Sequence, residues 1–130
     1  MQVRSAIGLA VALCAPLGWA REAVIVVQRS PVAGLRHYEA REVWHDISVG
    51  DRIKLVREPD NPYDPNAICI EWRGRKLGYL PRRDNAAVAR QIDRGETLEA
   101  RVSGLKENRN RSVRLDLEVI APLEREANRE

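Results

Sequence analysis

The chain has 130 residues, of which 32% are charged and 44% hydrophobic, and its formal net charge is +3 at pH 7. This length suffices for one domain with a single hydrophobic core and no stabilising disulfide or metal. The small net charge excludes a polycation, so any nucleic-acid binding must rest on a local basic patch.

Residues 1–20 have the pattern of a secretory signal peptide. A short basic segment is followed by an apolar segment at 5–17, and small residues at Gly18 and Ala20 provide a cleavage site. The apolar segment is shorter than the roughly twenty residues of a membrane span, although an uncleaved membrane anchor is the alternative. We therefore expect cleavage after Ala20 and a periplasmic or secreted protein. Cleavage leaves Cys69 as the only thiol, in an apolar strand that favours a buried, unreactive cysteine.

Residues 21–122 are expected to form one mainly β domain, followed by a charged, frayed tail at 123–130. The clearest strand signal is the alternation of apolar and charged residues at 113–119. Residues 39–47 have helical spacing but are too few to decide. Strands are expected at 23–27, 52–57, 67–72, 76–80, 98–102 and 113–119, with another beginning at 35–38.

One helix is predicted, beginning at a cap formed by Asp84 and Asn85 and ending near Arg94, where Gly95 follows. Its buried side is expected to consist of Ala86, Ala87, Val88, Ala89 and Ile92. Because strands outnumber this helix, the predicted fold is mainly β with one or two short helices, in which a small antiparallel sheet curls into a barrel.

The most distinctive stretch of the chain is REPDNPYDPNAI at residues 57–68. Proline fixes φ, and Asp or Asn side chains close turns on their own backbone, so this stretch is predicted to be a rigid connection between two strands. Tyr63 stands between two prolines and is flanked by Asp60, Asn61 and Asp64. Its ring can stack on a flat ligand while the polar groups bind the ligand's edge. On spacing alone, a purely structural turn that docks Tyr63 on the core stays open.

This stretch and its neighbours resemble the HIRAN domain family. The motifs are Gly50-Asp51, R-E-P at 57–59, N-P-Y-D-P-N-A-I at 61–68 and G-Y-L at 78–80, and the resemblance extends over about 32–119. It implies a modified OB-like barrel. The family occurs as an accessory module of helicase-like fork-remodelling proteins and as stand-alone bacterial proteins. Its best-understood members hold the 3′ end of single-stranded DNA through aromatic stacking, phosphate contacts and an acidic residue at the terminal hydroxyl.

The resemblance implies roles for individual residues. Tyr63 would stack on the terminal base, Asn61 would hold the backbone or base edge, and Asp64 would accept a hydrogen bond from the 3′-hydroxyl. Arg36 and Arg82 would contact phosphates. The complete set of expected binding residues is Arg36, His37, Tyr38, Asp60, Asn61, Tyr63, Asp64, Tyr79 and Arg82.

Two departures from the family pattern weaken base stacking, which is worth ~1–3 kcal/mol per base. His37 stands where the DNA-end binders carry a second stacking tyrosine. The chain has no Phe, and the loop that would carry a late aromatic residue reads NRNR at 108–111. The added arginines can recover some affinity, in a salt-sensitive form.

Independently of the family, Arg36, Arg57, Arg82 and Arg111 can form a basic rim beside the tyrosines, as in single-strand binders. The alternative is that these arginines are solvated and paired with carboxylates.

The predicted export signal favours a second interpretation of the pocket. An exported protein rarely meets replication forks, so the pocket can instead serve an envelope protein or another ligand that is not nucleic acid.

An enzyme is not expected. No CxxC, HExxH or glycine-rich phosphate loop is present, and His45-Asp46 is a neighbouring pair expected to be exposed. We therefore expect a monomeric module that binds single-stranded DNA, with no catalytic residues, metal or cofactor, and with no membrane contact beyond the signal peptide.

Overall fold

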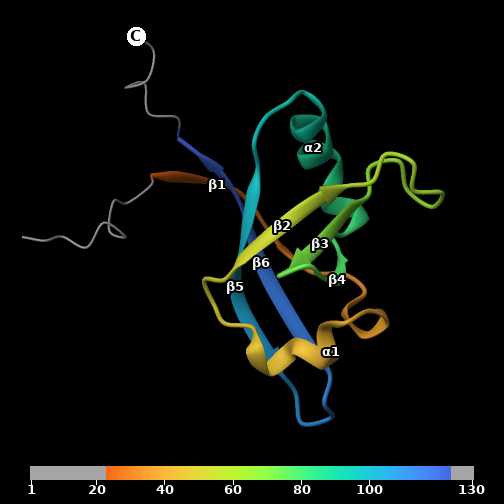
Figure 1. Cartoon of the computed structure of the whole chain (residues 1–130), viewed down its shortest axis with the longest axis vertical. Coiled ribbons are helices and arrows are strands. Elements are labelled where there is room, and N and C mark those ends of the chain that lie inside the picture. The colour runs from red at the N-terminus through yellow and green to blue at the C-terminus, as the bar shows by residue number, and fades with distance from the viewer. Residues whose placement is uncertain (1–22, 124–130) are drawn as a thin grey trace, which may run out of the picture.

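The computed structural model describes residues 23–123, in which six strands form one antiparallel sheet (Figure 1). The strands lie in the order β1-β6-β5-β2-β3-β4. They are β1 (Val24–Pro31), β2 (Arg52–Arg57), β3 (Ile68–Trp72), β4 (Arg75–Tyr79), β5 (Glu99–Glu107) and β6 (Val113–Pro122). The described helices are α1 (Ala40–Val43) and α2 (Arg82–Asp93), with 3₁₀ turns η2 (Leu35–His37) and η3 (Trp44–Asp46).

The alternation predicted at 113–119 is confirmed in β6. Leu115, Leu117 and Val119 are fully buried, whereas Arg114 before them is exposed and Asp116 and Glu118 between them are only half-buried. The core continues through strands β3, β4 and β5 and includes Val88 of α2. All six strands expected outside residues 35–38 are present.

The two edges of the sheet meet at a single point. Ala33, just after β1, pairs with Tyr79 of β4 through Ala33 N to Tyr79 O at 2.8 Å and Tyr79 N to Ala33 O at 2.9 Å. Gly78 permits this approach, because a Cβ there would lie 2.3 Å from the Ala33 carbonyl oxygen. The predicted mainly β, OB-like fold is confirmed, but the sheet is joined by this bridge and is not closed by a continuous ladder.

The prediction that a strand begins at residues 35–38 is wrong. Gly34 has a φ of 82°, and its carbonyl accepts a hydrogen bond from His37 N at 2.9 Å, so the chain turns into η2 after β1. This turn buries Leu35. The undecided segment at 39–47 is helical, because α1 and η3 bury Ala40, Val43 and Trp44 against the sheet.

Helix α2 begins at Arg82, two residues before the predicted cap. Pro81 is the N-cap residue, and no side chain caps this end. Asn85 instead points inward and is only 2% exposed, while Ala87, expected to be buried, is exposed. Gly95 follows the helix with a φ of 89°, which supports the predicted end.

Cys69 is buried and unpaired, and burial raises the pKa of its thiol to about 11. The predicted signal peptide and most of the predicted tail lie outside the described residues. Within residues 23–123, no helix combines the length and apolar composition needed to cross a membrane.

Candidate functional site

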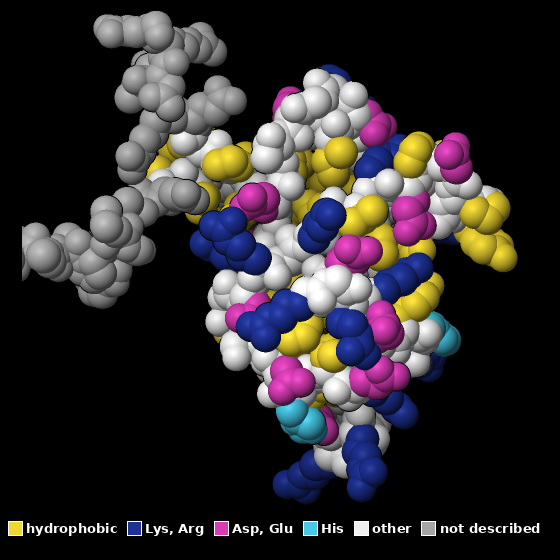
Figure 2. Space-filling model, viewed as in Figure 1, with side chains coloured by type: hydrophobic (Ala, Val, Ile, Leu, Met, Phe, Trp, Pro, Cys, Tyr) yellow, Lys and Arg dark blue, Asp and Glu magenta, His cyan; other side chains and the backbone are white. Residues whose placement is uncertain are grey.

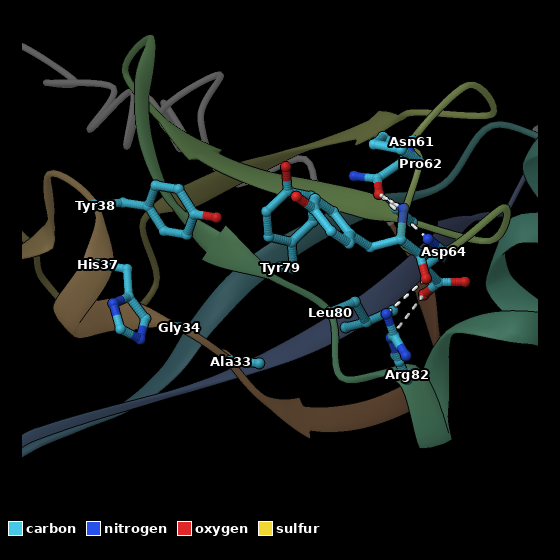
Figure 3. A pocket seen from close by; sticks show the side chains of 12 residues that line it. Ala33, Gly34, His37, Tyr38, Asn61, Pro62, Asp64, Tyr79, Leu80 and Arg82 are labelled. Carbon is cyan, nitrogen blue, oxygen red and sulfur yellow. Dashed lines mark hydrogen bonds and ion pairs between the residues drawn. The ribbon is translucent and has the colours of Figure 1, made fainter.

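A pocket of about 380 Å³ lies between η2, β4 and the loop that connects β2 to β3 (Figure 3). We call the loop, residues 58–67, the proline loop, and the cavity the tyrosine pocket. Of the expected binding residues, Arg36 and Asp60 lie outside the lining of this pocket. The expected residues that do line it are His37, Tyr38, Asn61, Tyr63, Asp64, Tyr79 and Arg82.

The proline loop is held by the side chain of Asn61. Its Oδ1 accepts hydrogen bonds from Tyr63 N at 2.9 Å and Asp64 N at 3.2 Å, and its Nδ2 donates to Glu58 Oε1 at 3.0 Å. Asn61 is therefore engaged within the loop and positions its neighbours. Tyr63 is 81% exposed, which excludes the alternative that the loop docks this ring on the core.

Asp64 fastens the proline loop to α2. Its Oδ1 accepts from Asn66 N at 2.9 Å, its Oδ2 accepts from Asn85 Nδ2 at 2.7 Å, and Arg82 Nε lies 3.9 Å away. The backbone bond from Asn66, with help from Asn85 and Arg82, lowers the pKa of Asp64 despite partial desolvation. The carboxylate is therefore ionised at neutral pH.

Arg82 also contacts the loop directly, because its Nη2 donates to Tyr63 O at 2.6 Å. Its side chain is 71% exposed, so it still presents N–H groups to solvent beside the pocket.

Two aromatic rings of the pocket lining pack against a cation, Lys76, that is not itself part of the lining. The rings of Tyr38 and Tyr79 meet edge to face, with centroids 5.8 Å apart and an interplanar angle of 65°. Lys76 Nζ lies 4.4 Å from the centroid of each ring and donates to Tyr79 Oη at 2.7 Å. Tyr79 Oη in turn donates to Glu58 Oε1 at 2.9 Å, which links β4 to the proline loop.

These contacts raise the pKa values of both Tyr79 and Lys76. The hydrogen bond from Lys76 acts to lower the pKa of Tyr79, but desolvation and the bond to Glu58 outweigh it, so this pKa is raised. Desolvation acts to lower the pKa of Lys76, but the bond to Tyr79 and nearby electrostatic interactions raise it. Lys76 is therefore a cation and Tyr79 a neutral phenol at neutral pH.

The sequence did not predict that Lys76 contacts Tyr79, because residues three apart in a regular strand point to opposite faces. The pairing of β3 with β4 shifts register here: Glu71 pairs with Lys76, but Ile70 pairs with Gly78. This irregularity brings Lys76 to the ring of Tyr79, and no local pattern indicated it.

The basic rim expected from the sequence is only partly formed. Arg57 has a side chain that is 13% exposed and bonds both carboxylate oxygens of Asp93, at 3.0 and 3.1 Å. It is thus a structural residue that joins β2 to α2.

Sites for other chemistry are not evident in the described part of the chain. Among residues 23–123, no three His, Cys, Asp or Glu side chains gather as a metal site would require. His45 and Asp46 are both exposed.

The profile of the HIRAN domain matches residues 25–124. The chain belongs to the HIRAN domain family. Helicase-like transcription factors from mouse and rabbit are each 38% identical to this HIRAN domain over 66 residues, which is 50% of the chain and 6% of theirs. A putative SWI/SNF-related matrix-associated actin-dependent regulator of chromatin, subfamily A member 3-like 1, from Arabidopsis thaliana is 33% identical over 96 residues, 72% of this chain and 10% of that protein.

Solved structures support the same assignment. A Lactobacillus plantarum protein has a TM-score of 0.64 and 29% identity, covering 76% of this chain and 97% of its own. The HIRAN domain of human HLTF has a TM-score of 0.58 and 27% identity, covering 72% of this chain and 73% of its own. The chain spans only a tenth or less of the curated relatives it matches, so the alignment concerns the HIRAN domain alone.

Proposed function

We propose that this HIRAN domain is a non-catalytic nucleic-acid-binding module that holds the 3′ end of single-stranded DNA in the tyrosine pocket. The observation that carries this proposal is Tyr63, which is 81% exposed on a loop fixed by Asn61 and Asp64. An exposed ring on a rigid loop provides a surface for base stacking, and little conformational entropy is lost when a base binds.

The charges around the pocket fit a nucleotide. Lys76 lies over the ring of Tyr79, and Arg82 donates a hydrogen bond to the backbone oxygen of Tyr63. Both residues therefore supply positive charge next to tyrosines of the pocket. Phosphate oxygens are the natural partners of such groups. Asp64 supplies a carboxylate that is ionised at neutral pH and can accept a further hydrogen bond, as a terminal hydroxyl requires. The names of the relatives, which refer to helicase-like transcription factors and chromatin regulation, agree with a nucleic-acid ligand.

The test is fluorescence anisotropy with labelled single strands whose 3′ end is free or phosphorylated. We expect the free end to bind more tightly. Tyr63→Ala should weaken binding by roughly 5- to 150-fold, the equivalent of ~1–3 kcal/mol for one stacked base, whereas Tyr63→Phe, which keeps the ring, should bind like the wild type. Weak, end-independent binding that is unchanged by Tyr63→Ala would refute the proposal.

A second function is favoured by the predicted signal peptide at residues 1–20. In this proposal the protein is exported to the periplasm, and the tyrosine pocket serves an envelope protein or another ligand that is not nucleic acid. Cell fractionation with N-terminal sequencing tests it: a mature chain that begins at Arg21, together with no binding of oligonucleotides, would support it. A cytoplasmic chain that retains Met1 would refute it.

A further inference from the structure

A second cavity, of about 430 Å³, adjoins the tyrosine pocket and shares Gly34 and His37 with it. Three arginines from separate segments line it: Arg36 in η2, Arg41 in α1 and Arg111 in the turn between β5 and β6. We call this cavity the arginine groove. A smaller hollow of about 220 Å³ continues from it and shares Arg41 and Arg111. The tyrosine pocket and the arginine groove therefore form one path along the surface.

The three groove arginines form no ion pair within residues 23–123, although Glu107 lines the adjoining hollow beside Arg41 and Arg111. Arg29, Arg75 and Arg101, in contrast, each form an ion pair with a glutamate. Arg36 makes a long hydrogen bond, 3.4 Å from its Nε to the ring of His37. Figure 2 shows Lys and Arg side chains gathered at the end of the molecule where Figure 1 places the turn between β5 and β6.

The backbone at Arg111 is an unusual feature of this turn. Its φ of 65° lies in the left-handed region, which costs a non-glycine residue of the order of 1 kcal/mol. Arg111 N donates to Asn108 O at 2.9 Å, and Asn108 N donates to Ser112 O at 2.8 Å, so the turn holds this conformation. The turn therefore holds the Arg111 side chain at the rim of the groove, which it lines.

We propose that the arginine groove is a second phosphate-binding site, which holds inner phosphates of the same DNA strand whose end occupies the tyrosine pocket. This inference rests on the proposed function. Arginine suits the task because its planar guanidinium binds phosphate oxygens through two hydrogen bonds and is always charged. The shared wall at Gly34 and His37 lets one strand reach both sites without crossing the core. The pocket thus recognises the end, and the groove adds affinity that does not depend on the end.

The test compares two variants with the same change in charge. Arg41→Gln/Arg111→Gln removes two groove cations, and Arg90→Gln/Arg94→Gln removes two exposed cations at α2, at the opposite end of the molecule in Figure 1. Binding of a strand of about ten nucleotides, within the usual span of roughly 4–16 for OB folds, is measured against salt concentration. Each lost phosphate contact should reduce the slope of log K against log salt by about 0.7 for a single strand, so the groove variant should lose about 1.4.

The outcomes separate the two proposals. If the wild type binds with a preference for the free 3′ end, and only the groove variant loses salt dependence while keeping that preference, the inference is supported. If the wild type shows the preference but both double variants behave alike, the groove inference fails and the proposed function stands. If no strand binds with end preference and Tyr63→Ala has no effect, both fail. Matching thermal unfolding curves for the two variants exclude misfolding as the cause.

A length series supplies a second readout. Affinity of the wild type should rise with strand length until the groove is occupied, and the groove variant should lose this gain. Equal binding by anionic lipid vesicles and single strands, with the same loss in the groove variant, would instead show a general anion site and overturn the assignment to a DNA strand.

Discussion

Asn85 Nδ2 donates a hydrogen bond to Asp64 Oδ2 at 2.7 Å, and this contact joins the first turn of α2 to the proline loop. The amide is 2% exposed, and the carboxylate side chain is 16% exposed. Because the buried amide of Asn85 bonds the charged carboxylate of Asp64, the position of the proline loop depends on the position of α2. The position of the loop that carries Tyr63 is therefore set in part by a residue that itself lies outside the pocket lining.

Removing this donor should weaken both the fold and the site. Asn85→Ala leaves the Asp64 carboxylate short of one hydrogen bond, so we expect the free energy of unfolding to fall by about 1–3 kcal/mol. Urea denaturation measures this change, and strand affinity should fall with it. Asn66→Ala is the control, because Asn66 contributes its backbone N–H to Asp64 and that group remains. Equal losses in both variants would contradict the special role of Asn85.

The Asp64 carboxylate should make the protein sensitive to acid. Its folded-state pKa is lowered from the ordinary 3.8, first by the Asn66 backbone bond and then by Asn85 and Arg82. The unfolded chain therefore binds a proton more readily than the folded chain. The contribution of Asp64 is fully present above the unfolded pKa and is lost as pH falls through the lower folded pKa.

Unfolding in urea from about pH 6 to about pH 3 measures this dependence. In Asp64→Asn, the free energy of unfolding should fall less steeply as the pH is lowered than it does in the wild type. This difference in slope is expected whatever the stability of the variant at neutral pH. Glu39, Asp51 and Glu118 also have lowered pKa values, so a residual slope is expected. Parallel curves for wild type and variant would show that Asp64 does not contribute.

The bridge between the sheet edges should not tolerate a side chain at Gly78. In Gly78→Ala the new Cβ would lie 2.3 Å from Ala33 O and 2.8 Å from Val32 Cγ1, so the backbone must move apart. We expect a loss of about 1–3 kcal/mol in stability, as for overpacked sites, together with weaker strand binding because Ala33 and Tyr79 both line the pocket.

Gly104→Ala is the matched control for the bridge. Its Cβ would meet Asp116 Oδ2 at 3.6 Å, an ordinary contact, and thermal unfolding should shift little. Similar midpoints for the two alanine variants would show that the edges are not held together at Gly78.

Lys76 should control the ionisation of Tyr79 as well as ligand binding. Its hydrogen bond is the largest influence on the pKa of Tyr79 and acts to lower it. In Lys76→Met, the pKa of Tyr79 should therefore rise further above its ordinary value of 10.0. Absorbance of tyrosinate during alkaline titration measures this without any ligand.

Strand affinity of Lys76→Met should also fall, by about 5-fold for the loss of roughly 1 kcal/mol of cationic interaction. Lys54→Met, at an exposed position of β2, removes the same charge away from the rings and should change neither quantity. An unchanged tyrosinate titration in Lys76→Met would contradict the contact between Lys76 and Tyr79.

The sequence alone determined the features that depend on short-range order. The alternation in β6 predicts which side chains are buried, because a strand has a period of two. The prolines and Asx residues predict a rigid proline loop, since they restrict φ and close turns locally. The positive φ of Gly95 likewise lies where this glycine indicated the end of the helix. These signals need no knowledge of distant contacts.

Only the tertiary structure decided how these pieces meet. Asn85 has the local features of a helix cap, yet the carboxylate of Asp64 draws it into the interior. Arg57 has the local features of a surface cation, yet Asp93 fixes it beside α2. The register shift in β4 brings Lys76 to Tyr79, and the turn at Gly34 places η2 between the tyrosine pocket and the arginine groove. The positions of Asn85 and Arg57 depend on pairing between residues far apart in the chain, where packing and hydrogen bonding override local preference.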